Sequence, residues 1–226
     1  MEKIVIYQVM PRLFGANSTK CVPGGSKREN GCGHLADFPG AALAEIKGLG
    51  ATHVWYTGII EHATKTDYSD YGIQRDHPAV VKGNAGSPYA IKDYYDIDPD
   101  LATKVPDRFK EFENLLNRTH KAGLKVIIDF VPNHVARQYH SDAKPMQVRD
   151  LGEDDEPTWA FSKQNNFYYL PGQKFSPNFS LYDPEMGEYR EKPCKATGND
   201  CFTPWVDRND WYETVKLNYG VDYQGN

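Results

Sequence analysis

The segment spanning residues 125–134 (KVIIDFVPNH) constrains the fold of this chain more than any other part of it. Its apolar residues show no polar alternation, which is typical of a strand buried on both faces in a parallel sheet. Ligands of such sheets bind at the carboxyl ends of the strands. The pattern therefore places Asp129, Asn133 and His134 where a site is expected. The alternative is that Asp129 caps a turn and that His134 is an ordinary loop histidine.

Strands and helices alternate along the first half of the chain. Apolar, β-branched runs predict strands at 4–10, 52–60 and 125–131. Apolar residues at helical spacing predict helices at 39–50 and 106–123. The order strand–helix–strand–helix–strand predicts right-handed βαβ units and a parallel sheet, and hence an α/β fold.

The segments outside these elements are long. Residues 15–38 and 61–104 are expected to be loops, and only a short stretch near 210–216 after His134 suggests a helix. A final segment of about ninety residues is too long for an ordinary loop and indicates a subdomain. We therefore expect two domains, at 1–134 and 135–226.

Composition excludes some classes of protein. The chain has 26 basic and 31 acidic side chains, and a net charge of −5 argues against a nucleic-acid partner. No stretch reaches the ~18 apolar residues needed to span a membrane. The 15 Tyr, 10 Phe and 4 Trp are consistent either with flat surfaces that stack on sugar rings or with side chains that fill strands and loop cores.

The four cysteines fall into two local pairs, Cys21 with Cys32 and Cys194 with Cys201. Neither pair has the spacing of a metal site, and both suit local disulfides in an oxidising compartment. The first residues run directly into a strand and lack the features of a signal peptide. As written, the chain is expected in the cytoplasm, or in the periplasm or exterior if a leader has been removed.

Four segments resemble the α-amylase family of glycoside hydrolases. Residues 129–134 (DFVPNH) resemble the family's signature at the end of barrel strand three, and 6–12 (IYQVMPR) resemble its first strand. Residues 87–94 (SPYAIKDY) are similar to the stretch after strand two, and 215–218 (VKLN) to a signature near the end of an inserted domain. The resemblance implies a (β/α)8 TIM barrel, of which this chain holds the first three strands and two helices, with an irregular domain inserted after strand three.

The resemblance also implies roles for individual residues. Tyr89 would stack on the sugar ring whose bond is cut, and His134 would hydrogen-bond a hydroxyl of that ring. Asp129 would be a structural carboxylate behind the site, and Asn133 matches a position that binds calcium in many relatives. These residue types suit sugars and hard cations. The alternative for Tyr89 is a tyrosine that only packs a loop.

The match departs from the family pattern at Lys216. Calcium-binding relatives carry an Asp there, and the segment is closer to the neopullulanase and cyclomaltodextrinase branch. An ammonium at this position would supply the positive charge itself. We therefore expect no cofactor, with Ca²⁺ at Asn133 a doubtful exception.

The catalytic carboxylates of the family are expected beyond Asn226. A retaining glycosidase needs two carboxyl groups about 5 Å apart, and the family takes them from later strands of the barrel. The acidic run Glu153, Asp154, Asp155 and Glu156 is better explained as a solvated loop. Three strands cannot close a barrel, so we expect the first part of a longer enzyme that is inactive alone.

The leading hypothesis is an α-glucan-active, retaining glycoside hydrolase. Its partners would be an α-glucan or maltooligosaccharide substrate and the remainder of the same polypeptide. The alternative is a non-catalytic homologue that serves as a carbohydrate-binding or scaffold module, which retention of Tyr89 and His134 disfavours. A different barrel enzyme, such as a phosphate-binding aldolase, is disfavoured by the lack of a Gly-rich phosphate loop.

Overall fold

The computed structural model of this chain describes residues 3–225 and divides into two compact units. Unit 1 comprises residues 3–61, 70–72 and 95–130, and unit 2 comprises residues 62–69, 73–94 and 131–225. This division differs from the one predicted at residue 134. The difference arises because most of the expected loop 61–104 packs with the last part of the chain.

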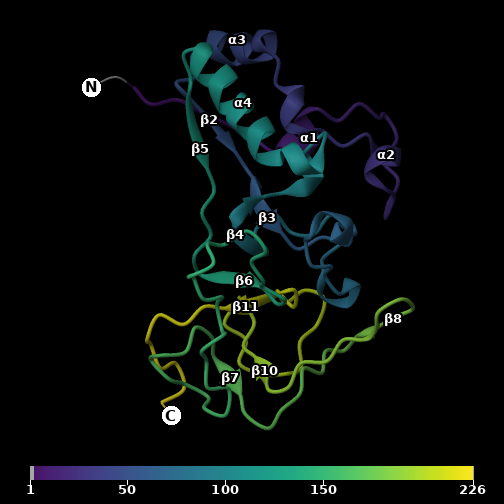
Figure 1. Cartoon of the computed structure of the whole chain (residues 1–226), viewed down its shortest axis with the longest axis vertical. Helices are drawn as coiled ribbons and strands as arrows, with labels where there is room; N and C mark the ends of the chain where they lie inside the picture. Colours follow the sequence, from purple (N-terminus) through teal and green to yellow (C-terminus); the bar gives the residue numbers. More distant parts are fainter. Residues whose placement is uncertain (1–2, 226) are drawn as a thin grey trace. The chain divides into compact units, whose positions relative to one another are not determined.

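Unit 1 contains a parallel three-stranded sheet (Figure 1). Its strands are β1 (Ile6–Val9), β2 (His53–Tyr56) and β5 (Lys125–Ile128), in the order β1-β2-β5. The predicted strands and their parallel pairing are confirmed, although each strand is shorter than predicted. The register aligns Ile6 with His53 and His53 with Lys125.

Helix α4 covers the sheet and fixes its core (Figure 1). It packs against β5 and against α3, and its Leu115 is completely buried. Thr119 of α4 lies 2.7 Å from the hydroxyl of Tyr56 on β2, in the core. The helices are α1 (Pro11–Phe14), α2 (Lys27–Asn30), α3 (Gly40–Gly48) and α4 (Arg108–Lys121).

The prediction that β5 is buried on both faces is wrong. Ile128 is partly exposed, and Phe130, just beyond the strand, is 69% exposed. The reason is that β1 and β5 form the two edges of the sheet, and within residues 3–225 no further strand pairs with either edge. The unpaired edges that three strands must leave are therefore present, as predicted.

Among the described residues, unit 2 contains three short antiparallel strand pairs. The predicted helix near 210–216 is wrong, because Val215 is buried opposite Val135 in a strand pair. The predicted loop 61–104 also contains strands, β3 and β4, which pair with each other. The antiparallel pairs are β6 (His134–Ala136) with β11 (Thr214–Lys216), β7 (Tyr169–Leu170) with β10 (Cys194–Lys195), and β8 (Tyr182–Asp183) with β9 (Gly187–Glu188). The other two strands are β3 (Ile60–His62) and β4 (Ile91–Ile97), and each has residues in both units.

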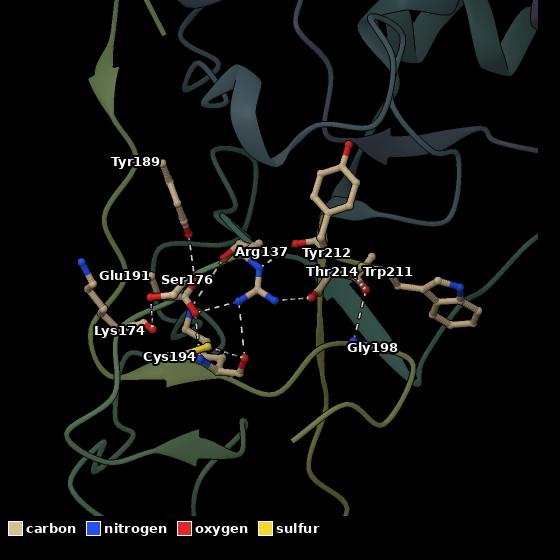
Figure 2. A network of polar contacts seen from close by, with 11 residues as sticks. Arg137, Lys174, Ser176, Tyr189, Glu191, Cys194, Gly198, Trp211, Tyr212 and Thr214 are labelled. Carbon is tan, nitrogen blue, oxygen red and sulfur yellow. Dashed lines mark hydrogen bonds and ion pairs between the residues drawn. The ribbon is translucent and has the colours of Figure 1, made fainter. Parts of the chain in front are cut away.

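A buried guanidinium joins these pairs (Figure 2). Arg137 follows β6 and donates hydrogen bonds to the carbonyls of Tyr212 at 2.8 Å and Thr214 at 3.1 Å. It also forms a 2.7 Å ion pair with Glu191 and lies 4.1 Å from the ring centroid of Phe175. The single side chain thus connects β6, the entry to β11 and the segment before β10.

The four cysteines are free, so the predicted local disulfides are not formed. Cys194 is completely buried, and its thiol lies 3.3 Å from the carbonyl of Lys195. Burial raises the pKa of this thiol to about 12. The side chain therefore acts as a small core residue.

Among the described helices, none combines the length and the apolar character that crossing a membrane requires.

Candidate functional site

A pocket of about 430 Å³ in unit 2 contains both sugar-contacting residues predicted from the sequence. Tyr89 and His134 are far apart in the chain, and the fold brings them to the same cavity. Two larger hollows, of about 510 and 550 Å³, contain neither residue. The lining residues are Lys82, Ser87, Tyr89, Val131, His134, Trp211, Glu213 and Thr214.

Strand pairing and a tight turn position the two residues. His134 begins β6 opposite Lys216 of β11, and its ring lies 5.0 Å from that of Trp211. Tyr89 sits on the turn before β4, where Ser87 accepts a hydrogen bond from its backbone N–H at 3.3 Å. The Tyr89 side chain is 41% exposed, so part of its ring remains available to a ligand.

The surroundings of His134 favour the neutral form of its imidazole. Burial lowers its pKa below the ordinary 6.5, and the Lys216 ammonium lowers it further, against a hydrogen bond with the Tyr89 backbone that raises it. Its Nδ1 lies 3.1 Å from the side-chain oxygen of Asn133. The ring is therefore fixed in orientation and carries one donor and one acceptor at neutral pH.

We expect the nuclear magnetic resonance titration of the His134 ring to have a midpoint below pH 6.5. Because the pKa is depressed in the folded state, the stabilisation linked to His134 is fully present above pH 6.5. It is lost as the pH falls through the folded-state pKa. His134→Gln should flatten this part of the pH dependence of unfolding, and a midpoint above 6.5 would contradict the expectation.

The surroundings of Asn133 do not fit a calcium site. Asn133 is exposed, and its side-chain oxygen already contacts His134. On the neighbouring strand, the Lys216 ammonium pairs with the carboxylate of Asp200 and lies 4.9 Å from the ring centroid of Tyr223. The Lys216 ammonium repels a divalent cation. The nearby carboxylate of Asp200, which could otherwise bind a cation, is already paired with this ammonium.

A chelator should therefore leave the melting temperature of the chain unchanged. The measurement is thermal unfolding followed by circular dichroism, with and without excess EDTA. A drop that added Ca²⁺ restores would show that the amide of Asn133 does bind a cation.

Of the other carboxylates considered in the sequence, Asp129 and Asp155 accept hydrogen bonds inside the fold. Asp129, half-buried in unit 1, accepts hydrogen bonds from the indole of Trp55 at 2.5 Å and the backbone of Gly58 at 3.1 Å. Asp155 does not belong to a solvated run, because it accepts hydrogen bonds from the Asn166 and Phe167 backbone N–H groups at 2.6 and 3.0 Å. Its neighbours in the acidic run, Glu153, Asp154 and Glu156, are exposed as predicted.

Four residues of the pocket lie outside the motifs that were recognised in the sequence. Trp211, Glu213 and Thr214 fall in the stretch that was predicted to be helical, and Lys82 falls in a predicted loop. Recognition of β11 would have signalled Trp211 and Glu213, because a strand places the residues before it beside its partner strand. Nothing in the sequence distinguishes Lys82 from other loop lysines.

Comparison with known proteins identifies the family. Residues 28–209 match the family model described as "Alpha amylase, catalytic domain". Maltase A2 of Drosophila melanogaster is 27% identical over 164 residues, covering 73% of this chain and 22% of the relative. Cyclomaltodextrin glucanotransferase of Bacillus sp. (strain 38-2) is 25% identical over 219 residues, covering 90% and 29%. The chain thus spans less than a third of either relative.

A shorter match has higher identity. An amino acid transporter heavy chain of Rattus norvegicus is 45% identical over 51 residues, which cover 23% of this chain and 7% of that relative. The family model matches most of the chain, and the chain belongs to the α-amylase family of glycoside hydrolases, whose catalytic domains are TIM barrels.

Proposed function

We propose that this chain contributes the sugar-binding part of an α-glucan-active, retaining glycoside hydrolase. The observation that carries the proposal is the common pocket of Tyr89 and His134. Both residues were assigned to a sugar ring from separate sequence motifs. Their presence in one cavity of suitable size supports both assignments together.

The chemistry of the pocket suits a glucose unit. The exposed face of Tyr89 offers a flat apolar surface to the C–H face of a pyranose, and Trp211 offers a second aromatic wall. The neutral imidazole of His134 pairs with a hydroxyl without attracting ions. An α-glucan or maltooligosaccharide is the substrate that this combination and the family favour.

Hydrolysis requires groups in addition to those of this pocket. Among the described residues that line it, Glu213 is the only carboxyl group, whereas a retaining mechanism uses two about 5 Å apart. We infer that β1, β2 and β5 correspond to barrel strands one to three and that the catalytic pair comes from the remainder of the polypeptide. Unit 2 then corresponds to the inserted domain together with the turn that carries Tyr89.

Isothermal titration with maltotriose tests this proposal. The chain is expected to bind the sugar without releasing glucose, and Tyr89→Ala and His134→Ala are each expected to weaken binding about tenfold, or about 1.4 kcal/mol. Tyr182→Ala, which alters an exposed tyrosine outside the pocket, is the matched control. Equal affinities for all four proteins, or turnover by the chain alone, would reject the proposal.

The second candidate is a non-catalytic homologue, favoured by the local match to the transporter heavy chain. A scaffold module does not need a sugar pocket. Absence of maltotriose binding by the unmodified chain would favour this candidate.

A further inference from the structure

Glu213 lies in the pocket with one of its two carboxyl oxygens unsatisfied. Its side chain is 5% exposed, and Oε2 has no hydrogen-bond partner among the residues that the structure describes. Oε1 is 3.8 Å from Nζ of Lys82, whose side chain is 43% exposed. The carboxyl group is thus buried against the pocket, with one oxygen unsatisfied.

The fold does not need this side chain. The backbone carbonyl of Glu213 accepts the N–H of Arg137 at 2.8 Å, which any residue at this position would do. The contact with Lys82 exceeds hydrogen-bond length, and its solvent-exposed ammonium contributes little to stability. A buried carboxyl group with an unsatisfied oxygen destabilises the folded state. A buried oxygen without a hydrogen-bond partner calls for an explanation in a native structure, and a role in binding or catalysis is one such explanation.

The neighbouring residues define the ligand that would satisfy it. Tyr89 and Trp211 give the same cavity aromatic walls, and Lys82 gives it a donor beside the carboxyl acceptor. A carboxylate accepts hydroxyl hydrogens, whereas an ammonium donates to hydroxyl oxygens. Two adjacent hydroxyls of one sugar ring offer both. An anionic ligand would be repelled by Glu213, and an apolar ligand would leave Oε2 unsatisfied.

We propose that Glu213 is a sugar-binding residue, whose Oε2 accepts a hydrogen bond from one hydroxyl of a glucose unit while Lys82 donates to the adjacent hydroxyl. This inference rests on the proposed function, because it places a sugar between Tyr89 and Trp211. It adds a charged recognition element, formed by the turn before β4 and the residues just before β11. The pocket thereby selects sugar rings in which the two adjacent hydroxyls that face Glu213 and Lys82 are both free.

The proposal has a stability signature that a structural role lacks. Burial raises the pKa of Glu213, an effect that its own backbone N–H, Lys82 and Arg137 only partly offset. Removal of the charge should therefore leave the melting temperature unchanged or raise it. A structural ion pair would predict a lower melting temperature for Glu213→Gln and for Glu213→Leu.

The decisive experiment is titration of the chain with methyl α-D-glucopyranoside and its monodeoxy derivatives. One deoxy position should lower the affinity of the unmodified chain about tenfold, and the same position should have no effect in Glu213→Leu. Glu213→Leu should bind the parent glucoside about tenfold more weakly, and Glu213→Gln should lose less because it keeps an acceptor. Glu188→Gln, an exposed glutamate outside the pocket, is the matched control.

The outcomes separate this inference from the proposed function. Weaker glucoside binding in Tyr89→Ala but unchanged binding in both Glu213 variants would overturn the inference and leave the proposed function intact. Absence of binding by the unmodified chain would overturn both. The deoxy series on the unmodified chain does not depend on the folding of any variant, and uniform affinities across that series would also overturn the inference.

Discussion

Arg137→Leu should lower the free energy of unfolding of unit 2 by about 3–5 kcal/mol, the range for breaking a buried ion pair by removal of one partner. The substitution removes the hydrogen bonds to Tyr212 and Thr214 and leaves the Glu191 carboxylate buried without its guanidinium. Glu191 retains hydrogen bonds from the Tyr189 hydroxyl at 2.8 Å and the Lys195 backbone at 2.7 Å. These do not neutralise its charge. Urea unfolding followed by circular dichroism measures the change.

The matched control is Arg190→Leu. Arg190 has a side chain that is 83% exposed and contacts Glu188 at 3.3 Å, so its loss should change stability by less than about 0.5 kcal/mol. A double variant, Arg137→Met with Glu191→Leu, removes both charges together. It should recover much of the loss, because an apolar pair is often as stable as a buried ion pair. A double variant as unstable as Arg137→Leu would show that the backbone hydrogen bonds of Arg137 dominate.

Gly86→Ala is expected to destabilise unit 2 by more than about 2 kcal/mol and to weaken glucoside binding as well. Gly86 has a positive φ of 74°, and a Cβ atom there would lie 1.7 Å from the carbonyl oxygen of Ala63. The turn cannot relieve this overlap without moving, because Ala63 also donates its N–H to Ala90 at 3.0 Å. Movement of the turn displaces Tyr89. Chemical unfolding and titration calorimetry on the same variant test both effects.

Gly83→Ala separates backbone strain from steric overlap. Gly83 has a similar φ of 66°, but a Cβ atom there would meet nothing within 4 Å. The left-handed conformation alone costs about 1 kcal/mol for alanine, so this variant should be mildly destabilised and should bind normally. Equal effects of the two substitutions would mean that the Ala63 contact does not fix the turn.

The fold was predictable where periodicity spans many residues. The parallel strands and the helices α3 and α4 follow from apolar runs and helical spacing, and all are present. The antiparallel pairs of unit 2 were not predictable, because their strands of two or three residues have no measurable period. The seven-residue strand β4 was missed because its sequence, IKDYYDI, does not alternate between apolar and polar residues. Residues 214–216 illustrate this, since only burial of Val215 opposite Val135 determines that they form a strand.

The site was predictable only through its motifs. Tyr89, Asn133 and His134 stand in recognisable segments, whereas Glu213 and Trp211 enter the pocket through a strand pair that the sequence does not reveal. The state of the cysteines depends in the same way on tertiary packing, which buries Cys194. Motifs thus indicated part of the pocket, and long-range pairing determined the rest.

The walls of the pocket come from three stretches of chain, near residues 82–89, 131–134 and 211–214. Contacts of such large sequence separation form slowly, because the entropy of closing the intervening loops must be overcome first. Newly synthesised chains should therefore acquire sugar affinity only after all three stretches have packed together. Affinity for a glucoside then serves as a conformational reporter of the completed native state, and the bound sugar would slow its loss.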